Sequence, residues 1–451
     1  MTFNANINST MVRVAWEKMT STDRVLILIY SYLPLCGHIS ITGLKLFGIT
    51  VTPYRALIPL IFMLFLVPRL EFDRGVLIKI YHGKQQIRFC LTVGIMFFYG
   101  VISLFGSPYV VMREGYLELY NIFLGILSVF IVCEISLIKG GIQFLFNAFR
   151  AIILVFVLLG LLEIVTGKHL AVSRYADPAF LSSLGFESKT IKMASGLYYN
   201  VNDFSAVISL FSPLFYFRRH ASYFVKILSI ITLVSITFIL LVNDSWISLF
   251  AFLVGFVYYF FASNSKSRAR GLLFGVLGFL LVAYLGGEIY VAVSHQFHAA
   301  SQQRGSLFLR LNTYLVSVRE TIIQTYGFGF GVGSFSNVME QLREPHVLVN
   351  PHSLWIEIFT QYGVIVFTLF ASFLLNIFRS LYRKHISQAK NNYLLISVLA
   401  MFIIFIMVAF SSSSWLKSSV MWLPIALSLA LTLDIRNENA DGILTGTLCS
   451  S

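Results

Sequence analysis

The chain has 451 residues, of which 57% are hydrophobic and 12% charged, with a formal net charge of +13. Soluble globular chains carry about 25% charged residues, so this composition excludes a soluble enzyme. Apolar runs of about 20 residues recur along the chain, which is typical of transmembrane helices. We assign the excess of Lys and Arg to contact with anionic lipid headgroups and expect no nucleic-acid partner, because no aromatic and basic module accompanies the charge.

The apolar runs predict an all-α polytopic membrane protein with about 12 transmembrane helices. In chain order the predicted spans lie near residues 24–42, 53–68, 87–106, 116–136, 145–166, 196–217, 222–242, 246–262, 271–291, 352–378, 392–412 and 416–433. The range 196–217 is the least regular of them, since it contains Asn200, Asn202 and Asp203.

The distribution of basic residues predicts the orientation. If there are 12 spans, the basic clusters at the N-terminus, after the second span and in three later loops all fall on one side, which places both termini in the cytoplasm. The predicted organisation is a cytoplasmic tail over 1–23, a single transmembrane domain over 24–433 and a cytoplasmic tail over 434–451. An external loop, 292–350, is inserted between spans 9 and 10.

Polar residues concentrate in and after this external loop, which breaks the charge rule with four arginines. Arg304 and Arg310 begin a segment that reads as an amphipathic helix at the membrane surface, and Tyr314 follows Arg310 by one turn. An arginine fork binds phosphate oxygens bidentately, so both arginines are candidates for holding a diphosphate. Arg319 and Arg343 fit solvated loop charges better.

A glycine-rich turn, "YGFGFGVGSF", follows this helix, with glycines at alternate positions from 327 to 333. Free backbone N–H groups at Gly329 and Gly331 would form an anion-binding nest. Alternatively, the glycines allow a flexible re-entrant turn or close helix packing. The sequence alone favours neither.

The next predicted helix begins with "NPHSLWIEIFTQYG". Pro351 fits the first helical position, which would put His352 in the first turn. A helix N-terminus lowers the pKa of an imidazole, so a neutral His352 can act as a general base; the alternative is an interfacial histidine hydrogen-bonded to a loop. Glu357, about 140° further around the helix, would pair with an arginine or orient a substrate hydroxyl.

No metal-binding motif accompanies these residues. His295 and His298 are three residues apart but have no carboxylate partner in the same loop. We therefore expect metal-independent chemistry without a cofactor.

The order of these motifs resembles the O-antigen ligase and O-antigen polymerase family. The matching elements are an Arg-x3-aromatic pair (Arg310, Tyr314), a G-x-G-x-x-F turn, and a His-Ser pair (His352, Ser353) followed after nine residues by Gly363. The segment Ala194–Leu210, which includes Asn202, is similar to the family's G-x-x-x-N-x-N stretch.

Two positions depart from the family pattern. Met193, preceded by Lys192, stands where an arginine is usual, and Ser245-Trp246 stands where the family has Ser-Arg. Lys192 or Arg174 would have to supply the second cation for the diphosphate.

The resemblance implies a GT-C-like, inverting, metal-independent glycosyltransferase in the bacterial inner membrane. Its donor would be an oligosaccharide linked to undecaprenyl diphosphate, and it would work beside membrane lipid, a flippase and a chain-length regulator. A polymerase would join repeat units into O-antigen, capsule or exopolysaccharide, whereas a ligase would transfer the glycan to lipid A core. His352 would take the proton of the attacking hydroxyl.

The sequence also bears on two further classes of function, a transporter and a scaffold. A transporter of polysaccharide or lipid-linked glycan should show charged sites near the bilayer midplane, often in repeated halves, and this sequence has few such charges and no visible repeat. A scaffold in an envelope complex would tolerate substitution of His352 and Arg310. Polymerase is the favoured reading of the two transferases, although both share the same motifs.

Overall fold

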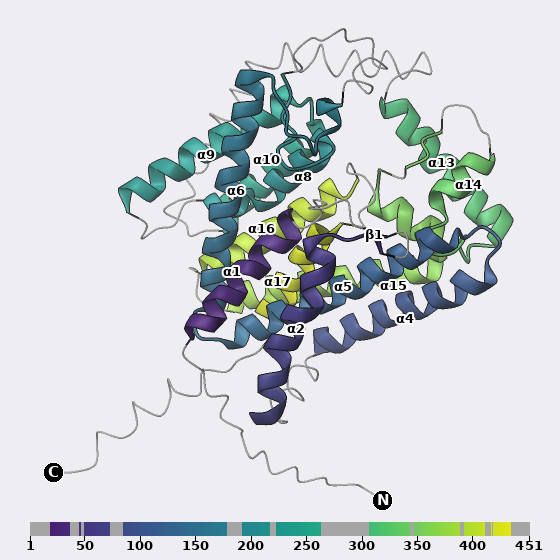
Figure 1. The fold of residues 1–451 in the computed structure, drawn as a ribbon, viewed down its shortest axis with the longest axis horizontal. Coiled ribbons are helices and arrows are strands. Elements are labelled where there is room, and N and C mark those ends of the chain that lie inside the picture. Colours follow the sequence, from purple (N-terminus) through teal and green to yellow (C-terminus); the bar gives the residue numbers. More distant parts are fainter. Residues whose placement is uncertain are drawn as a thin grey trace, which may run out of the picture.

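The computed structural model describes residues 19–36, 45–46, 49–72, 84–177, 192–216, 222–262, 306–342, 347–350, 352–387, 392–410, 416 and 418–433. These residues are helical apart from loops and one short antiparallel pair, β1 (Lys45–Leu46) with β2 (Ile49–Thr50). Figure 1 shows the helices gathered into one bundle.

The helices before the glycine-rich turn are α1 (Ser21–Cys36), α2 (Pro53–Phe72), α4 (Lys84–Gly106), α5 (Met112–Leu137), α6 (Gly141–Thr166), η1 (Arg174–Ala176), α8 (Val201–Phe211), η2 (Ser212–Phe215), α9 (Tyr223–Val242), α10 (Trp246–Ala262) and α13 (Ser306–Thr325). Those after it are α14 (Phe335–Leu342), α15 (Leu354–Ser387), α16 (Tyr393–Val408), η3 (Ser419–Met421) and α17 (Trp422–Thr432).

Within the described residues, five helices are long and apolar enough to cross a membrane: α4, α5, α6, α9 and α15. Five shorter apolar stretches of 10–17 residues accompany them. Helices lie within eleven of the twelve predicted ranges, and 271–291 lies outside the described residues. The structure thus supports a helical membrane protein, while the number of spans, the side of the termini and the domain plan stay predictions.

The centre of the bundle is built around α5, which packs against α2, α4 and α17. Gly125 makes the closest of these approaches possible, because a Cβ atom there would lie 2.1 Å from the indole ring of Trp422 on α17. Small residues at helix contacts are the usual means of bringing backbones together in membranes, where lipid is as apolar as the side chains.

One helix, α15, is broken at Gly363, whose backbone (φ 78°, ψ 179°) is not helical. The glycine-rich turn docks against this break. Phe330 N and Gly331 N donate to the carbonyls of Thr360 and Gln361 (2.8 and 2.9 Å), and Val364 N donates to the carbonyl of Gly327 (2.9 Å). The turn therefore satisfies backbone groups that the break releases inside a membrane protein.

The predicted external loop 292–350 contains two helices in its described part. The first, α13, coincides with the amphipathic segment that the sequence predicts, and the second, α14, is a short helix of eight residues. Figure 1 shows both at one end of the bundle, where α13 packs against α15.

Candidate active site at the start of α15

His352 stands just outside α15. The helix begins at Leu354, and Ser353 caps it, since the Ser353 hydroxyl accepts from Ile356 N (3.5 Å). The prediction that His352 occupies the first turn is therefore wrong by two residues. The sequence predicts Pro351 at the first helical position. Ser353 instead caps the helix, because its side chain can accept from one of the first N–H groups, which have no partner within the helix.

The backbone of His352 is strained. Its φ of 45° lies in the left-handed region, which is uncommon for residues other than glycine. Such strain costs about 1–3 kcal/mol and tends to concentrate at functional sites. The conformation is held in part by Leu354 N, which donates to the carbonyl of Ala409 (2.8 Å).

The imidazole of His352 is kept neutral. Burial lowers its pKa to about 4, and the positive charges of Arg310 and Arg174 act in the same direction. Burial and these two charges account for the lowered pKa of His352, whereas the sequence points to the helix N-terminus as its cause. Nδ1 is buried and has no hydrogen-bond partner among the described residues. A neutral ring with an unoccupied nitrogen is able to accept a proton.

The α13 helix brings Arg310 and Tyr314 to the histidine. Tyr314 Oη lies 3.2 Å from the carbonyl of His352 and 3.1 Å from that of Phe410, to which it donates. Burial lowers the pKa of Arg310, while Tyr314 and the carboxylate of Asp203 on α8 oppose this shift. The one-turn spacing of Arg310 and Tyr314 thus puts both residues on the part of α13 near His352.

Arg174 is the second cation beside His352. It begins η1, and its guanidinium donates to Tyr175 Oη (2.9 Å) and Asn200 Oδ1 (3.4 Å) and lies 5.0 Å over the Tyr175 ring. Arg174 is thus close enough to lower the pKa of His352, and Lys192 is an exposed residue.

The N-terminus of α8 forms another wall of the site. Asn200 caps this helix, since its Oδ1 accepts from Asn202 N (3.1 Å), and Asn202 Oδ1 accepts from the hydroxyl of Ser245 (3.2 Å). The start of α8 and the loop between α9 and α10 are therefore neighbours, although Asn202 and Ser245 are 43 positions apart in the sequence.

The glycine N–H groups are engaged by the protein itself. Gly329 N donates to Thr325 Oγ1 (2.9 Å) and Gly331 N to the carbonyl of Gln361 (2.9 Å). A Cβ atom at Gly329 would lie 2.5 Å from Gly363 N. The expected anion-binding nest would need these N–H groups free, so the geometry favours the packing role over the anion-binding one.

Two other candidates lie apart from the histidine or cannot be located. The side chain of Glu357 is 1% exposed and accepts from Leu416 N (3.3 Å), so it faces the packed interior. Arg304 lies outside the described residues.

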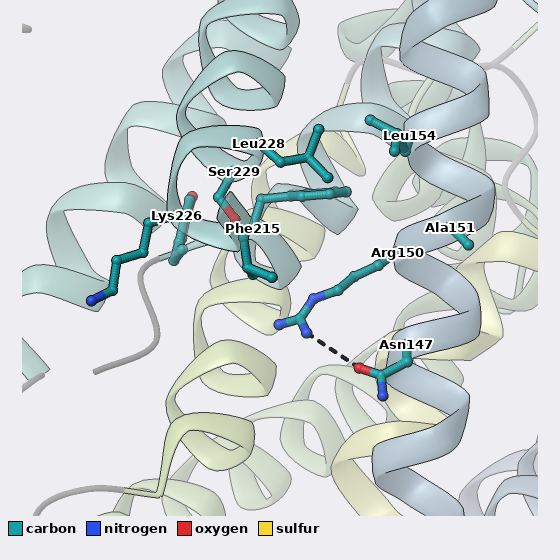
Figure 2. Close-up of a pocket in the computed structure, with 10 residues that line it drawn as sticks. Asn147, Arg150, Ala151, Leu154, Phe215, Lys226, Leu228 and Ser229 are labelled. Carbon is teal, nitrogen blue, oxygen red and sulfur yellow. Dashed lines mark hydrogen bonds between the residues drawn. The ribbon is translucent and has the colours of Figure 1, made fainter. Parts of the chain in front are cut away.

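A cavity of about 320 Å³ lies elsewhere, between α6, η2 and α9 (Figure 2). Arg150 reaches into it from α6 and donates to Asn147 Oδ1 (3.3 Å), the carbonyl of Leu214 (2.5 Å) and Tyr393 Oη. Glu163, near the C-terminal end of α6, contacts the loop that leads into α8 at the candidate site. Arg150 is 13 residues before Glu163 on the same helix, a distance of about 20 Å at 1.5 Å per residue. The cavity is therefore separate from the candidate site.

Comparison with known proteins bears on the part of the chain that carries α13, the glycine-rich turn and His352. Residues 205–371 match the family model described as O-antigen ligase. The match covers more than a third of the chain and supports the O-antigen ligase and polymerase family. No curated protein matches the chain.

The O-antigen ligase match extends from α8 to α15, so it contains Arg310, Tyr314 and His352 but not Arg174. Together with the apolar helices it indicates a membrane protein of polysaccharide biosynthesis, of the ligase or polymerase type. Arg174 lies outside the matched residues, and the sequence offers it only as one of two candidates, with Lys192, for the second cation.

Proposed function

We propose that the protein is a membrane glycosyltransferase that polymerises oligosaccharide repeat units carried on undecaprenyl diphosphate. The reaction takes place on the outer face of the bacterial inner membrane and yields a surface polysaccharide. The observation that carries this proposal is the neutral, partner-free Nδ1 of His352 beside two arginines, within a region that matches the O-antigen ligase model.

The proposed chemistry is a single inverting displacement. The acceptor hydroxyl oxygen attacks the anomeric carbon of the donor sugar, and the bond from that carbon to the diphosphate oxygen breaks. The diphosphate leaves with the bonding electron pair, and the hydroxyl proton passes to Nδ1 of His352. Arg310 and Arg174 balance the charge that develops on the leaving group.

Two arginines suit this leaving group without a metal ion. Each presents a planar fork of N–H donors that matches two phosphate oxygens. Their charge also keeps His352 neutral, since a cation beside two guanidinium groups is unfavourable. The donor site and the general base thus support each other.

A ligase that transfers the glycan to lipid A core is the second candidate, and the description of the matching family model favours it. The two enzymes share donor and base and differ in the acceptor. A flippase that delivers the donor is an expected partner in either case, and a chain-length regulator is expected only for the polymerase.

The test is transfer by the purified protein in nanodiscs, supplied with a lipid-linked repeat unit. A ladder of products supports the polymerase, and a single transfer to added lipid A core supports the ligase. His352→Ala should lower the rate at least about 100-fold, the usual range for loss of a general base. His385→Ala, at the far end of α15, is the matched control.

If the activity of His352→Ala is close to that of the wild type, His352 is not the general base. A chelator should leave the rate unchanged; strong inhibition that magnesium reverses would refute the metal-independent part. Facilitated movement of the lipid-linked unit across the bilayer without any glycan transfer would instead support a transporter.

A further inference from the structure

A buried carboxylate near the end of α6 holds two loops beside the candidate site. Glu163 is 4% exposed, and its Oε2 accepts from Ser195 N (2.7 Å) and Gly196 N (2.8 Å). Its Oε1 accepts from Leu170 N (3.3 Å). One side chain thus fixes the loop that leaves α6 and the loop that leads into α8.

A relay of hydroxyl groups joins this carboxylate to Arg174. Ser195 Oγ donates to Ser173 Oγ (2.7 Å), and Ser173 Oγ accepts from Tyr175 N (3.2 Å), which makes Ser173 the cap of η1. Arg174 lies between the capping serine and the capped residue. Its position therefore depends on the segment that Glu163 holds.

The same segment is held from the opposite side by Asn243. Ala194 N donates to Asn243 Oδ1 and Asn243 Nδ2 donates to the carbonyl of Ala194, both at 2.7 Å. Arg174 N also donates to the carbonyl of Tyr199, further along this loop (3.2 Å). Residues 194–199 thus form a rigid platform on which η1 rests.

We infer that Glu163 is a positioning residue that sets the guanidinium of Arg174 against His352 through Ser195 and Ser173. This inference rests on the proposed function, in which Arg174 holds the donor diphosphate. Glu163 does not touch the substrate in this scheme. Neither the sequence motifs nor the family match, which begins at residue 205, includes it.

Both oxygens of Glu163 act as hydrogen-bond acceptors for the two loops. Oε2 receives the N–H groups of Ser195 and Gly196 and, at 3.4 Å, the hydroxyl of Ser195, while Oε1 receives Leu170 N and lies 3.7 Å from His169 Nδ1. An ionised carboxylate can accept from all of these donors without rearrangement. The amide oxygen of a glutamine can still accept from Ser195 N and Gly196 N. Its NH2 group cannot accept from Leu170 N, so Glu163→Gln keeps the two contacts to residues 195–196 and loses that one. Glu163→Gln should therefore retain more activity than Glu163→Ala, which leaves all these buried donors unpaired and releases the platform.

The pH profile separates positioning from a direct effect of charge. His352 faces Arg310 and Arg174, with Asp203 and Tyr314 next to Arg310. Removing the negative charge of Glu163 by itself would lower the pKa of His352. Displacing Arg174 removes a nearby positive charge and raises that pKa, so Glu163→Ala should move the acidic limb of the rate upward and Glu163→Gln should not.

The closing experiment is a double-mutant cycle in nanodiscs with Glu163→Ala, Arg174→Gln and both together. We expect each single variant to lose at least tenfold in kcat/KM and the double variant to be no worse than Arg174→Gln. If Glu163→Ala does not fold, Ser173→Ala removes the hydrogen bond between Ser195 and Ser173 with a smaller change. It should produce the same upward shift in the pKa of His352. Glu134→Gln, another buried carboxylate about 30 Å along α5 from the glycine-rich turn, is the control.

The pKa of His352 is measured independently of activity, from the pH dependence of diethyl pyrocarbonate labelling of its peptide by mass spectrometry. Losses that multiply in the double variant, or a pKa that falls in folded Glu163→Ala and Ser173→Ala, overturn the inference. If the wild-type protein transfers no glycan while the upward shift is observed, the proposed function fails and the positioning role stands.

Discussion

At the scale of single residues, His352 combines three features that rarely occur together by chance of packing. Its backbone is in the left-handed region, its Nδ1 is buried without a partner among the described residues, and the charges of two arginines lower its pKa. Each feature costs free energy in the folded protein. Their coincidence at one histidine is what a general base beside a diphosphate site would require.

Tyr314 should keep this strained histidine in place. In Tyr314→Phe the hydroxyl that donates to the carbonyls of His352 and Phe410 is lost, which should cost about 1 kcal/mol of stability and lower kcat severalfold. Thermal unfolding in nanodiscs and the transfer rate measure the two effects. Tyr326→Phe is the control, because Tyr326 is 87% exposed; equal losses in both variants would contradict the role of Tyr314.

At the scale of elements, the break in α15 and the glycine-rich turn form one unit. The nine residues from Leu354 to Tyr362 make a short helix between the capping Ser353 and the break at Gly363. The turn then supplies hydrogen bonds to the backbone groups that the break exposes. The spacing of histidine and glycine in the sequence is therefore the length of the helical piece that connects the site to this joint.

Gly329→Ala should disrupt the joint. The φ of Gly329 is +89°, and a Cβ atom would lie 2.5 Å from Gly363 N and 2.6 Å from the carbonyl oxygen of Gln361. We expect a loss of several kcal/mol, seen as poor folding or a much lower unfolding temperature. Gly94→Ala is the matched control, since no atom lies within 4 Å of its added Cβ; similar behaviour of both variants would argue against the joint.

At the scale of the whole molecule, the site lies where loops and helix ends from distant parts of the chain converge. Arg174, the start of α8, α13 and the start of α15 meet there. The predicted topology puts this end of the bundle outside the cell. The twelve-span topology requires α8 and η2 to cross the membrane as one span. Their 15 residues reach only about 22 Å, whereas the hydrocarbon layer is about 30 Å thick.

Cysteine labelling tests that crossing. In a background without the four native cysteines, Lys168→Cys, after α6, should react with an impermeant maleimide in intact cells. Ser222→Cys, before α9, should react only after permeabilisation. Both positions are exposed. If the two cysteines label alike, α8 does not cross the membrane and the twelve-span topology is wrong.

Much of this was predictable from local sequence. Apolar runs determine where helices form in a membrane protein, because lipid offers the backbone no hydrogen bonds. The one-turn pair Arg310 and Tyr314 and the candidacy of His352 also follow from local spacing. The helix begins at Leu354, three residues after the predicted first position at Pro351, because Ser353 is the capping residue, which only the hydrogen bonds show.

The tertiary structure alone decided which side chains meet. Arg174 acts on the pKa of His352, the glycine N–H groups are used within the protein, and Glu163 accepts from Ser195 N, 32 residues further along the chain. Composition and periodicity describe what each segment prefers by itself. Contacts between segments depend on how the whole bundle packs, and a carboxylate or a glycine N–H has no role until that packing brings its partner within about 3 Å.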